Sequence, residues 1–131
     1  LEETYDAIIC LSVFYYFPMF HRPLEILARA TEKWLIIRSS FAEDTEIRDY
    51  PDPLLEEGYQ HLRTYLNIFS RSKIEDFLVA EGFQVTWIPD DRQTNCFQNK
   101  PEEVAQIPIP AEFLLAERIA PSPLKKYATN A

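Results

Sequence analysis

Glycine is scarce in this sequence: the 131 residues include only Gly58 and Gly82. A turn that holds a phosphate or a dinucleotide needs several closely spaced glycines, because a side chain would keep the backbone away from the ligand. The chain therefore has no glycine-rich nucleotide-binding turn, and this weakens an assignment to a nucleotide-binding or reductase domain.

Cysteine is scarce too, and neither Cys10 nor Cys96 has a partner at metal-ligand spacing. We expect two free thiols in a reducing compartment, the cytoplasm, and no metal site. Asp90-Asp91 is an alternative pair of cation ligands, but adjacent acids after a proline are more typical of a turn. No apolar run approaches the roughly 20 residues that span a bilayer, and no signal peptide is visible, so we expect no membrane partner.

Positive charge is limited, since 13 Lys and Arg face 21 Asp and Glu and the formal net charge is -8. Surfaces that bind nucleic acid need clustered basic residues, whereas these are scattered, so we expect no nucleic-acid partner. The chain does contain 47% hydrophobic residues, enough for one packed core in a single domain. Because it begins with Leu1 rather than Met, we expect a piece of a longer protein.

Two apolar runs, residues 5–11 and 34–37, predict strands that are buried on both faces, as in a parallel sheet. Between them, residues 23–30 have apolar side chains at helical spacing after a proline, which predicts a helix. Strand, helix and strand in this order form a right-handed βαβ unit. Residues 12–16 and 38–41 should then lie side by side at the carboxyl edge of the sheet, where ligands bind.

The second half of the chain predicts one more helix and two more strands. Ser72 and Glu75 form a capping box that begins a helix, and Gly82 ends it. Residues 84–88 alternate between apolar and polar side chains, which predicts a strand near a sheet edge. Residues 113–120 are apolar enough for a final strand in a central position.

The proline-bearing segment 42–64 is a long insertion at the carboxyl edge of the sheet, and we expect it to act as a lid over an acceptor pocket. No linker divides the sequence. We therefore expect one α/β domain over residues 1–120 and a loose tail over residues 121–131.

The order and spacing of three segments resemble the class I S-adenosylmethionine-dependent methyltransferases. These segments are "YDAIICLSVFYYF", then "RPLEILARAT" with "KWLIIRSS", then "YLNIFSRSKIEDFLVAEGFQVTWIPD", and the resemblance covers residues 4–120 without the glycine-rich motif. It implies a three-layer, Rossmann-like, mostly parallel sheet, with an antiparallel final strand inserted between its neighbours. The chain would be the carboxyl-terminal half of that fold.

The resemblance also implies an activity, the transfer of a methyl group from S-adenosylmethionine to a small-molecule or other O, N or C acceptor. By the same resemblance, Cys10, Leu11, Ser12 and Val13 line the methionine and sulfonium end of the cofactor. The glycine-rich turn would belong to a missing amino-terminal half, so we expect this chain to be inactive alone and to pair with that half or with a second copy. The alternative is a non-catalytic, methyltransferase-like partner subunit.

Tyr15 and Tyr16 are candidates for the pocket wall, because an aromatic face attracts a sulfonium cation. They are equally suited to ordinary packing. A histidine often stands at the Tyr16 position in related methyltransferases, so an acid-base role there is in doubt. His21 has a side chain suited to a general base at neutral pH, although a surface histidine beside a helix start is the simpler interpretation.

Two further residues are candidates for the acceptor side. Arg38, at the carboxyl end of a predicted strand, has the charge to bind an anionic acceptor, or alternatively to pair with Glu43-Asp44. Tyr65 follows the predicted lid and is a candidate for contact with the acceptor. The sequence does not identify a catalytic residue beyond the weak candidates Tyr16 and His21.

Overall fold

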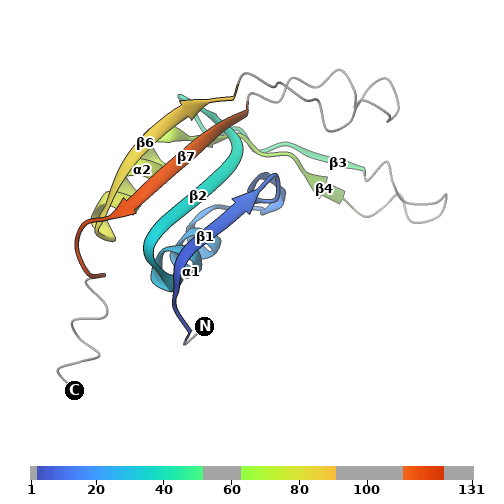
Figure 1. Cartoon of the computed structure of the whole chain (residues 1–131). Helices are drawn as coiled ribbons and strands as arrows, with labels where there is room; N and C mark the ends of the chain where they lie inside the picture. The colour runs from blue at the N-terminus through green and yellow to red at the C-terminus, as the bar shows by residue number, and fades with distance from the viewer. Residues whose placement is uncertain (1–2, 52–62, 91–110, 123–131) are drawn as a thin grey trace.

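The computed structural model describes residues 3–51, 63–90 and 111–122, in which strands predominate (Figure 1). The elements in chain order are β1 (Tyr5–Leu11), the short 3-10 helix η1 (Phe14–Tyr16), α1 (His21–Ala30), β2 (Thr31–Ala42), β3 (Asp49–Pro51), β4 (Arg63–Tyr65), β5 (Phe69–Ser70), α2 (Arg71–Ala80), β6 (Phe83–Pro89) and β7 (Ala111–Arg118).

The main sheet has the strand order β1-β2-β7-β6, and β5 pairs with the end of β2. Strands β1 and β2 are parallel, whereas β7 runs antiparallel to both of its neighbours, β2 and β6. The final strand is therefore central and inserted between earlier strands, which confirms that prediction. The edge position of β6 is confirmed as well.

The described helices pack on one face of this sheet and make a two-layer structure (Figure 1). The core lies between them and the strands, and its fully buried members include Leu24, Leu35, Ile37, Ile74, Leu78 and Leu114. On the opposite face Trp34 is 38% exposed. The prediction of a three-layer, Rossmann-like, mostly parallel fold was wrong: the sheet is mixed, and strand content exceeds helix content. A strand with apolar side chains on both faces is suited to burial on both sides. The sequence does not show whether the elements that would cover the second face belong to the same chain.

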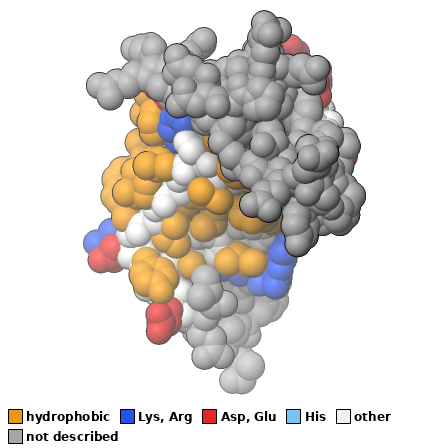
Figure 2. Space-filling view, turned by 90° about the vertical axis from the view of Figure 1, so that its right-hand side faces the viewer, with side chains coloured by type: hydrophobic (Ala, Val, Ile, Leu, Met, Phe, Trp, Pro, Cys, Tyr) orange, Lys and Arg blue, Asp and Glu red, His pale blue; other side chains and the backbone are white. Residues whose placement is uncertain are grey.

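Strand β1 has the predicted bounds, Tyr5–Leu11, but it is not buried on both faces. It is an edge strand of the sheet, and Ile9 is 62% exposed and Leu11 50% exposed. Figure 2 looks onto this side of the molecule and shows hydrophobic side chains gathered there, with the charged ones toward the margins. The edge strand therefore carries the apolar sequence of a central strand.

Helix α2 begins earlier than its sequence predicted. The N-cap is Ser70, whose hydroxyl accepts a hydrogen bond from the Lys73 backbone N–H at 3.4 Å, whereas the predicted cap Ser72 lies inside the helix. The predicted stop at Gly82 is confirmed by its φ of +99°, and an added Cβ would lie 2.3 Å from the Ala120 carbonyl oxygen.

Part of the predicted lid over residues 42–64 is described. Residues 49–51 and 63–65 pair as the antiparallel ribbon β3-β4, and residues 52–62 lie outside the described ranges. Of the predicted tail, only residues 121 and 122 are described. None of the helices in the described ranges is both long enough and apolar enough to cross a membrane.

Candidate functional site

The carboxyl end of β1 lies beside Arg38 of β2. Arg38 was predicted to end its strand, but β2 continues to Ala42, so Arg38 lies within it. The Ser12 backbone N–H donates to the Arg38 carbonyl oxygen at 3.0 Å and so extends the parallel pairing by one residue. Ser12 has a φ of +57°, a left-handed conformation that is uncommon for residues with a side chain. The predicted neighbourhood of residues 12–16 and 38–41 is therefore confirmed, and the chain turns sharply at that point.

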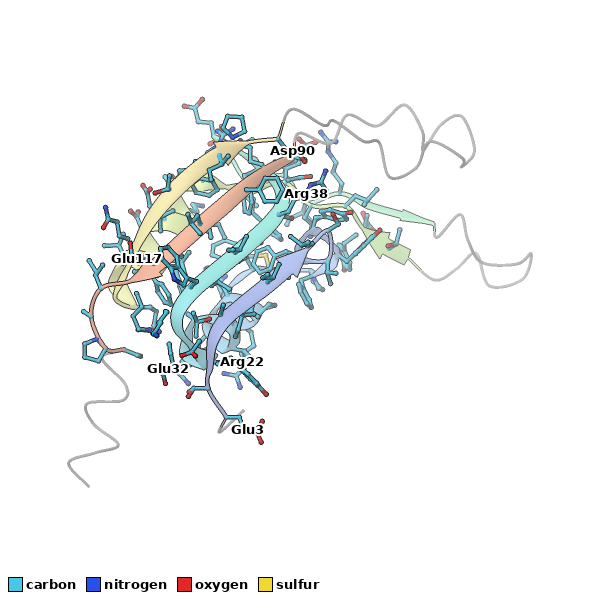
Figure 3. All side chains as sticks on the ribbon, in the orientation of Figure 1. Glu3, Arg22, Glu32, Arg38, Asp90 and Glu117 are labelled. Carbon is cyan, nitrogen blue, oxygen red and sulfur yellow. The ribbon has the colours of Figure 1, made fainter. Side chains whose placement is uncertain are left out.

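The side chain of Arg38 links three elements at this edge, and Figure 3 labels it together with one of its partners, Asp90. Its Nη1 donates to the Ser12 hydroxyl at 2.6 Å, and its Nε donates to Oδ2 of Asp90, just after β6, also at 2.6 Å. The Arg38 side chain is 16% exposed and that of Asp90 is 8% exposed. The sequence pointed to Glu43-Asp44 as the acidic partner, but the salt bridge is made across the sheet to Asp90.

A second polar side chain, that of Ser40, lies two residues beyond Arg38 on the same strand. Ser40 is 1% exposed, and its hydroxyl has no hydrogen-bond partner among the described residues. The buried hydroxyl of the neighbouring Ser39 likewise has no partner among the described residues. We define the edge cluster as Ser12, Arg38, Ser40 and Asp90.

The aromatic loop after β1 divides into buried and exposed members. Tyr15 is 3% exposed and Tyr16 is 40% exposed, and their ring centroids lie 4.7 Å apart in an edge-to-face contact. Phe14 is fully buried against the rings of Phe17 and Phe69. Of the two predicted pocket tyrosines, Tyr15 packs in the interior, and Tyr16 is partly exposed to solvent.

Asn67 holds this loop in place, and the sequence analysis missed it. Its Nδ2 donates to the Phe17 carbonyl oxygen at 2.7 Å, and its Oδ1 accepts from the Arg48 backbone N–H at 2.8 Å. Its own backbone N–H donates to the Tyr15 carbonyl oxygen at 2.9 Å. Asn67 is fully buried, so all these bonds are made away from water. A lone asparagine between apolar residues was the only available signal.

The four residues predicted to line the cofactor do not all face the same way. The Cys10 side chain is half-buried toward α1, and this burial raises the pKa of its thiol. Leu11 and Val13 are each about half exposed, and Ser12 bonds to Arg38. A ligand at the end of β1 would therefore meet the Ser12 hydroxyl and the apolar side chains of Leu11 and Val13, with Cys10 on the helix side.

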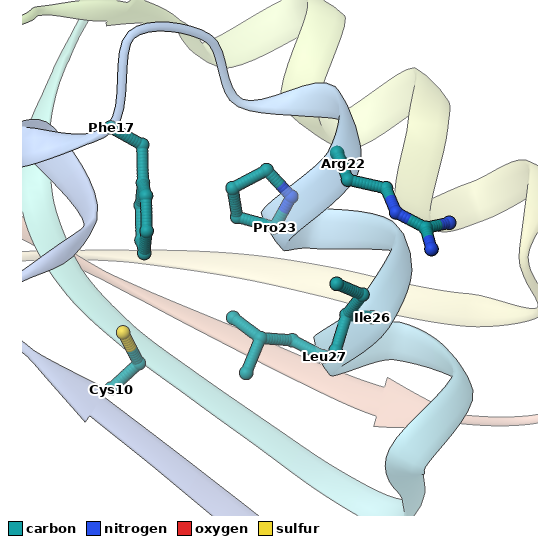
Figure 4. A pocket seen from close by; sticks show the side chains of 6 residues that line it. All are labelled: Cys10, Phe17, Arg22, Pro23, Ile26 and Leu27. Carbon is teal, nitrogen blue, oxygen red and sulfur yellow. The ribbon is translucent and has the colours of Figure 1, made fainter. Parts of the chain in front are cut away.

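A separate apolar pocket of about 240 Å³ lies on that helix side, between β1 and α1 (Figure 4). Its lining residues are Cys10, Phe17, Arg22, Pro23, Ile26 and Leu27. The guanidinium of Arg22 extends away from the cavity and pairs with Glu25 at 3.1 Å, so only the aliphatic stem of Arg22 faces the cavity. The pocket suits a hydrocarbon group rather than a charged one.

The remaining candidates lie apart from the edge cluster. His21 is exposed at the start of α1, where its ring stacks on Phe20 with centroids 4.0 Å apart. Tyr65 is half-buried in β4, opposite Asp49. Within the described ranges, neither side chain hydrogen-bonds to a member of the edge cluster.

For the part of the chain that the structure describes, no group of three or more His, Cys, Asp and Glu side chains is placed to hold a metal ion. No model of a known protein family matches the chain, and no curated protein matches it. The functional argument therefore rests on the strand order and on the geometry of the β1 end.

Proposed function

We propose that this chain is the acceptor side of an S-adenosylmethionine-dependent methyltransferase that works in the cytoplasm on a small-molecule or other O, N or C acceptor. Methyl transfer from a sulfonium requires little acid-base catalysis by the protein, because the methyl group is already activated. The protein mainly binds the cofactor and aligns the acceptor with the sulfur–methyl bond.

One observation carries the proposal, the position of β7. The last strand runs antiparallel between β2 and β6, and β2 follows β1 in parallel through α1. This order of strands is what the sequence resemblance to methyltransferases implies for the strands in this chain. The agreement supports the resemblance at the level of strand order, although the chain forms two layers rather than three.

The geometry at the end of β1 supports the same chemistry. The ring of Tyr16 is 40% exposed, and an aromatic face attracts a sulfonium more than a neutral thioether. Arg38 is held in a fixed position by Ser12 and Asp90 and carries a positive charge at the same edge of the sheet. These groups would orient a polar or anionic acceptor. We assign no general base, since His21 lies apart.

The adenosine end of the cofactor needs groups that this chain lacks. Gly58 and Gly82 are its only glycines, and Gly82 ends α2. A second segment with a glycine-rich turn would have to complete the site. We therefore propose that the chain acts together with such a segment and has no methyl-transfer activity alone.

The test is a calorimetric titration of the chain alone, and of the full product of its gene, with S-adenosylmethionine and with S-adenosylhomocysteine. The proposal expects binding to the full product. A Tyr16→Ala change in that product should weaken S-adenosylmethionine binding about fivefold, and S-adenosylhomocysteine binding less, because only the former is a cation. Tyr5→Ala, which removes an exposed ring at the other end of β1, is the matched control and should change neither affinity.

Failure of both ligands to bind would overturn the proposal and favour a non-catalytic partner subunit. Equal losses for the two ligands in Tyr16→Ala would remove the role that we give to this ring. Tight binding to the chain alone would overturn the need for a second segment.

A further inference from the structure

We propose that Asn67 is a positioning residue for Tyr16: it joins the aromatic loop to the β3–β4 ribbon, so that these two segments open and close as one unit. We define the aromatic loop as residues 13–18 and the ribbon base as residues 46–48 and 66–68. The role of Tyr16 rests on the proposed function, whereas the joining of the two segments does not. The inference follows from the direction of each polar group of Asn67.

Asn67 lies in the ribbon base, where the antiparallel pairing continues beyond β3 and β4. The pairs on either side of it share one register, Asp49 with Tyr65 in the ribbon and Glu46 with Ile68 in an isolated bridge. Asn67 is therefore opposite Ile47. Glu46 and Ile68 exchange two backbone hydrogen bonds, at 2.7 and 2.9 Å. Because bonded and non-bonded pairs alternate along an antiparallel ladder, the Asn67 N–H points away from Ile47, to the outer side of the ribbon.

The aromatic loop occupies that outer side, beside the ribbon and at the end of β1 (Figure 1). The Asn67 backbone N–H donates to the Tyr15 carbonyl oxygen at 2.9 Å, and Nδ2 of the side chain donates to the Phe17 carbonyl oxygen at 2.7 Å. Tyr15 and Phe17 flank Tyr16 in the chain. Asn67 therefore holds the backbone on both sides of the residue whose ring is 40% exposed.

The other end of the Asn67 side chain is bonded to the ribbon base. Its Oδ1 accepts a hydrogen bond from the Arg48 backbone N–H at 2.8 Å, and the Leu66 N–H donates to the Arg48 carbonyl oxygen, also at 2.8 Å. Asn67 is fully buried, so a broken bond would leave a polar group unpaired away from water. Moving either segment without the other therefore costs at least one buried hydrogen bond.

An amide suits this position because one planar group presents both a donor and an acceptor. An ionised carboxylate presents acceptors only, whereas a protonated carboxyl again presents one donor and one acceptor. Asn67→Asp should therefore lose the bond to Phe17 when the new carboxyl is ionised and regain it when the carboxyl is protonated. Burial and a facing carbonyl oxygen both favour the protonated form, so we expect the bond to return at mildly acid pH.

The test is hydrogen exchange of the full gene product, measured by mass spectrometry on fragments that cover residues 13–18 and 44–49. At about pH 7.5, Asn67→Asp should speed the exchange of both fragments about tenfold, because a buried hydrogen bond is lost. At about pH 5.5, after correction for the intrinsic exchange rate, both should return to within about threefold of the unsubstituted product.

Two variants are the controls. Asn67→Ala has no group to protonate, so both fragments should exchange fast at both pH values. Ile74→Val trims a fully buried side chain of α2 and should leave both fragments unchanged, although it lowers the stability of the fold. The charged side chains of the ribbon base do not titrate between these pH values: Arg48 hydrogen-bonds to Glu46 and lowers the pKa of its carboxyl.

Faster exchange in only one fragment would overturn the joining of the two segments, and so would the absence of any recovery of Asn67→Asp at the lower pH. If Asn67→Asp does not fold at the higher pH, the unsubstituted product decides. Its two fragments should then show the same dependence of exchange on low concentrations of urea, as one cooperative unit does. Different dependences would overturn the proposal.

The positioning of Tyr16 has its own readout. In the full product at about pH 7.5, Asn67→Asp should weaken S-adenosylmethionine binding about fivefold and S-adenosylhomocysteine binding less, and the difference should disappear at about pH 5.5. Equal losses for the two ligands would overturn the positioning role. If the unsubstituted product binds neither ligand, the proposed function and the role of Tyr16 fail together, and the exchange measurement still decides whether Asn67 joins the two segments.

Discussion

Arg38 donates a hydrogen bond of 2.6 Å from its guanidinium to the hydroxyl of Ser12, a residue with a φ of +57°. The bond fixes the side chain of a residue whose backbone conformation is unfavourable. Through the salt bridge of Arg38 with Asp90, the same contact connects the end of β1 to the end of β6. The edge cluster is thus held from three strands, β1, β2 and β6.

Two substitutions at Ser12 separate the backbone from the side chain. Ser12→Ala and Ser12→Gly both remove the hydroxyl, but only glycine adopts a positive φ without steric cost. We expect the glycine variant to have the higher free energy of unfolding, by about 1 kcal/mol, measured by urea denaturation. Equal stability of the two variants would show that Ser12 is not held in the left-handed conformation.

Asn67→Ala should destabilise the chain by about 2 kcal/mol or more, because the Phe17 carbonyl oxygen and the Arg48 N–H both lose a buried partner. Denaturation followed by tryptophan fluorescence measures the loss. Asn67→Asp is the informative comparison: it keeps an acceptor for Arg48 but removes the donor to Phe17. We expect it to be at least as harmful at neutral pH, since it places a carboxylate against a carbonyl oxygen.

The strands and helices were largely predictable, because the information for them is local. The apolar run in residues 5–11 predicted β1, and Gly82 predicted the end of α2, where the φ is positive. The central position of the last strand was also correct. The predicted cap of α2 was wrong: Ser72 lies inside the helix, and Ser70, with an extended backbone and a bond from the Lys73 N–H, is the cap.

The number of layers was not predictable, because a sequence does not state whether the surface that covers a strand belongs to the same chain. Ile8 packs against the core and Ile9 is exposed, although both lie in the same apolar run. The site was predictable in part. Ser12 and Arg38 were expected to lie close together. Asp90 and Asn67 come from segments more than 20 residues away in sequence, and no sequence motif predicts their contacts.

Burial raises the pKa of the Cys10 thiol, which has a consequence for its reactivity. The thiolate is the form that reacts with iodoacetamide, so in a Cys96→Ser chain the alkylation rate of native Cys10 should reach its plateau at a higher pH than in the urea-unfolded chain. Because the folded state favours the protonated thiol, its contribution to stability is present below the unfolded pKa and is lost as the pH rises through the folded pKa. Identical pH profiles in the two states would show that folding does not raise the pKa of Cys10.

The exposed apolar surface at β1 should make the isolated chain associate with itself without forming a closed dimer. Ile9→Lys should reduce this association in light scattering, because a charge at a sheet edge opposes pairing. Val79→Lys is the matched control: Val79 is 56% exposed, similar to Ile9, but lies on α2, away from β1. Equal effects of the two changes would indicate a general effect of charge rather than a specific role of β1.

The central claim is that the end of β1 binds the sulfonium end of S-adenosylmethionine once a second segment supplies the glycine-rich turn. The most direct measurement is the calorimetric titration of S-adenosylmethionine into the full gene product and into its Tyr16→Ala variant. The account predicts binding to the full product and an affinity about fivefold lower in the variant, with no heat of binding for the isolated chain. No binding to the full product would contradict the account and leave the chain as a non-catalytic partner.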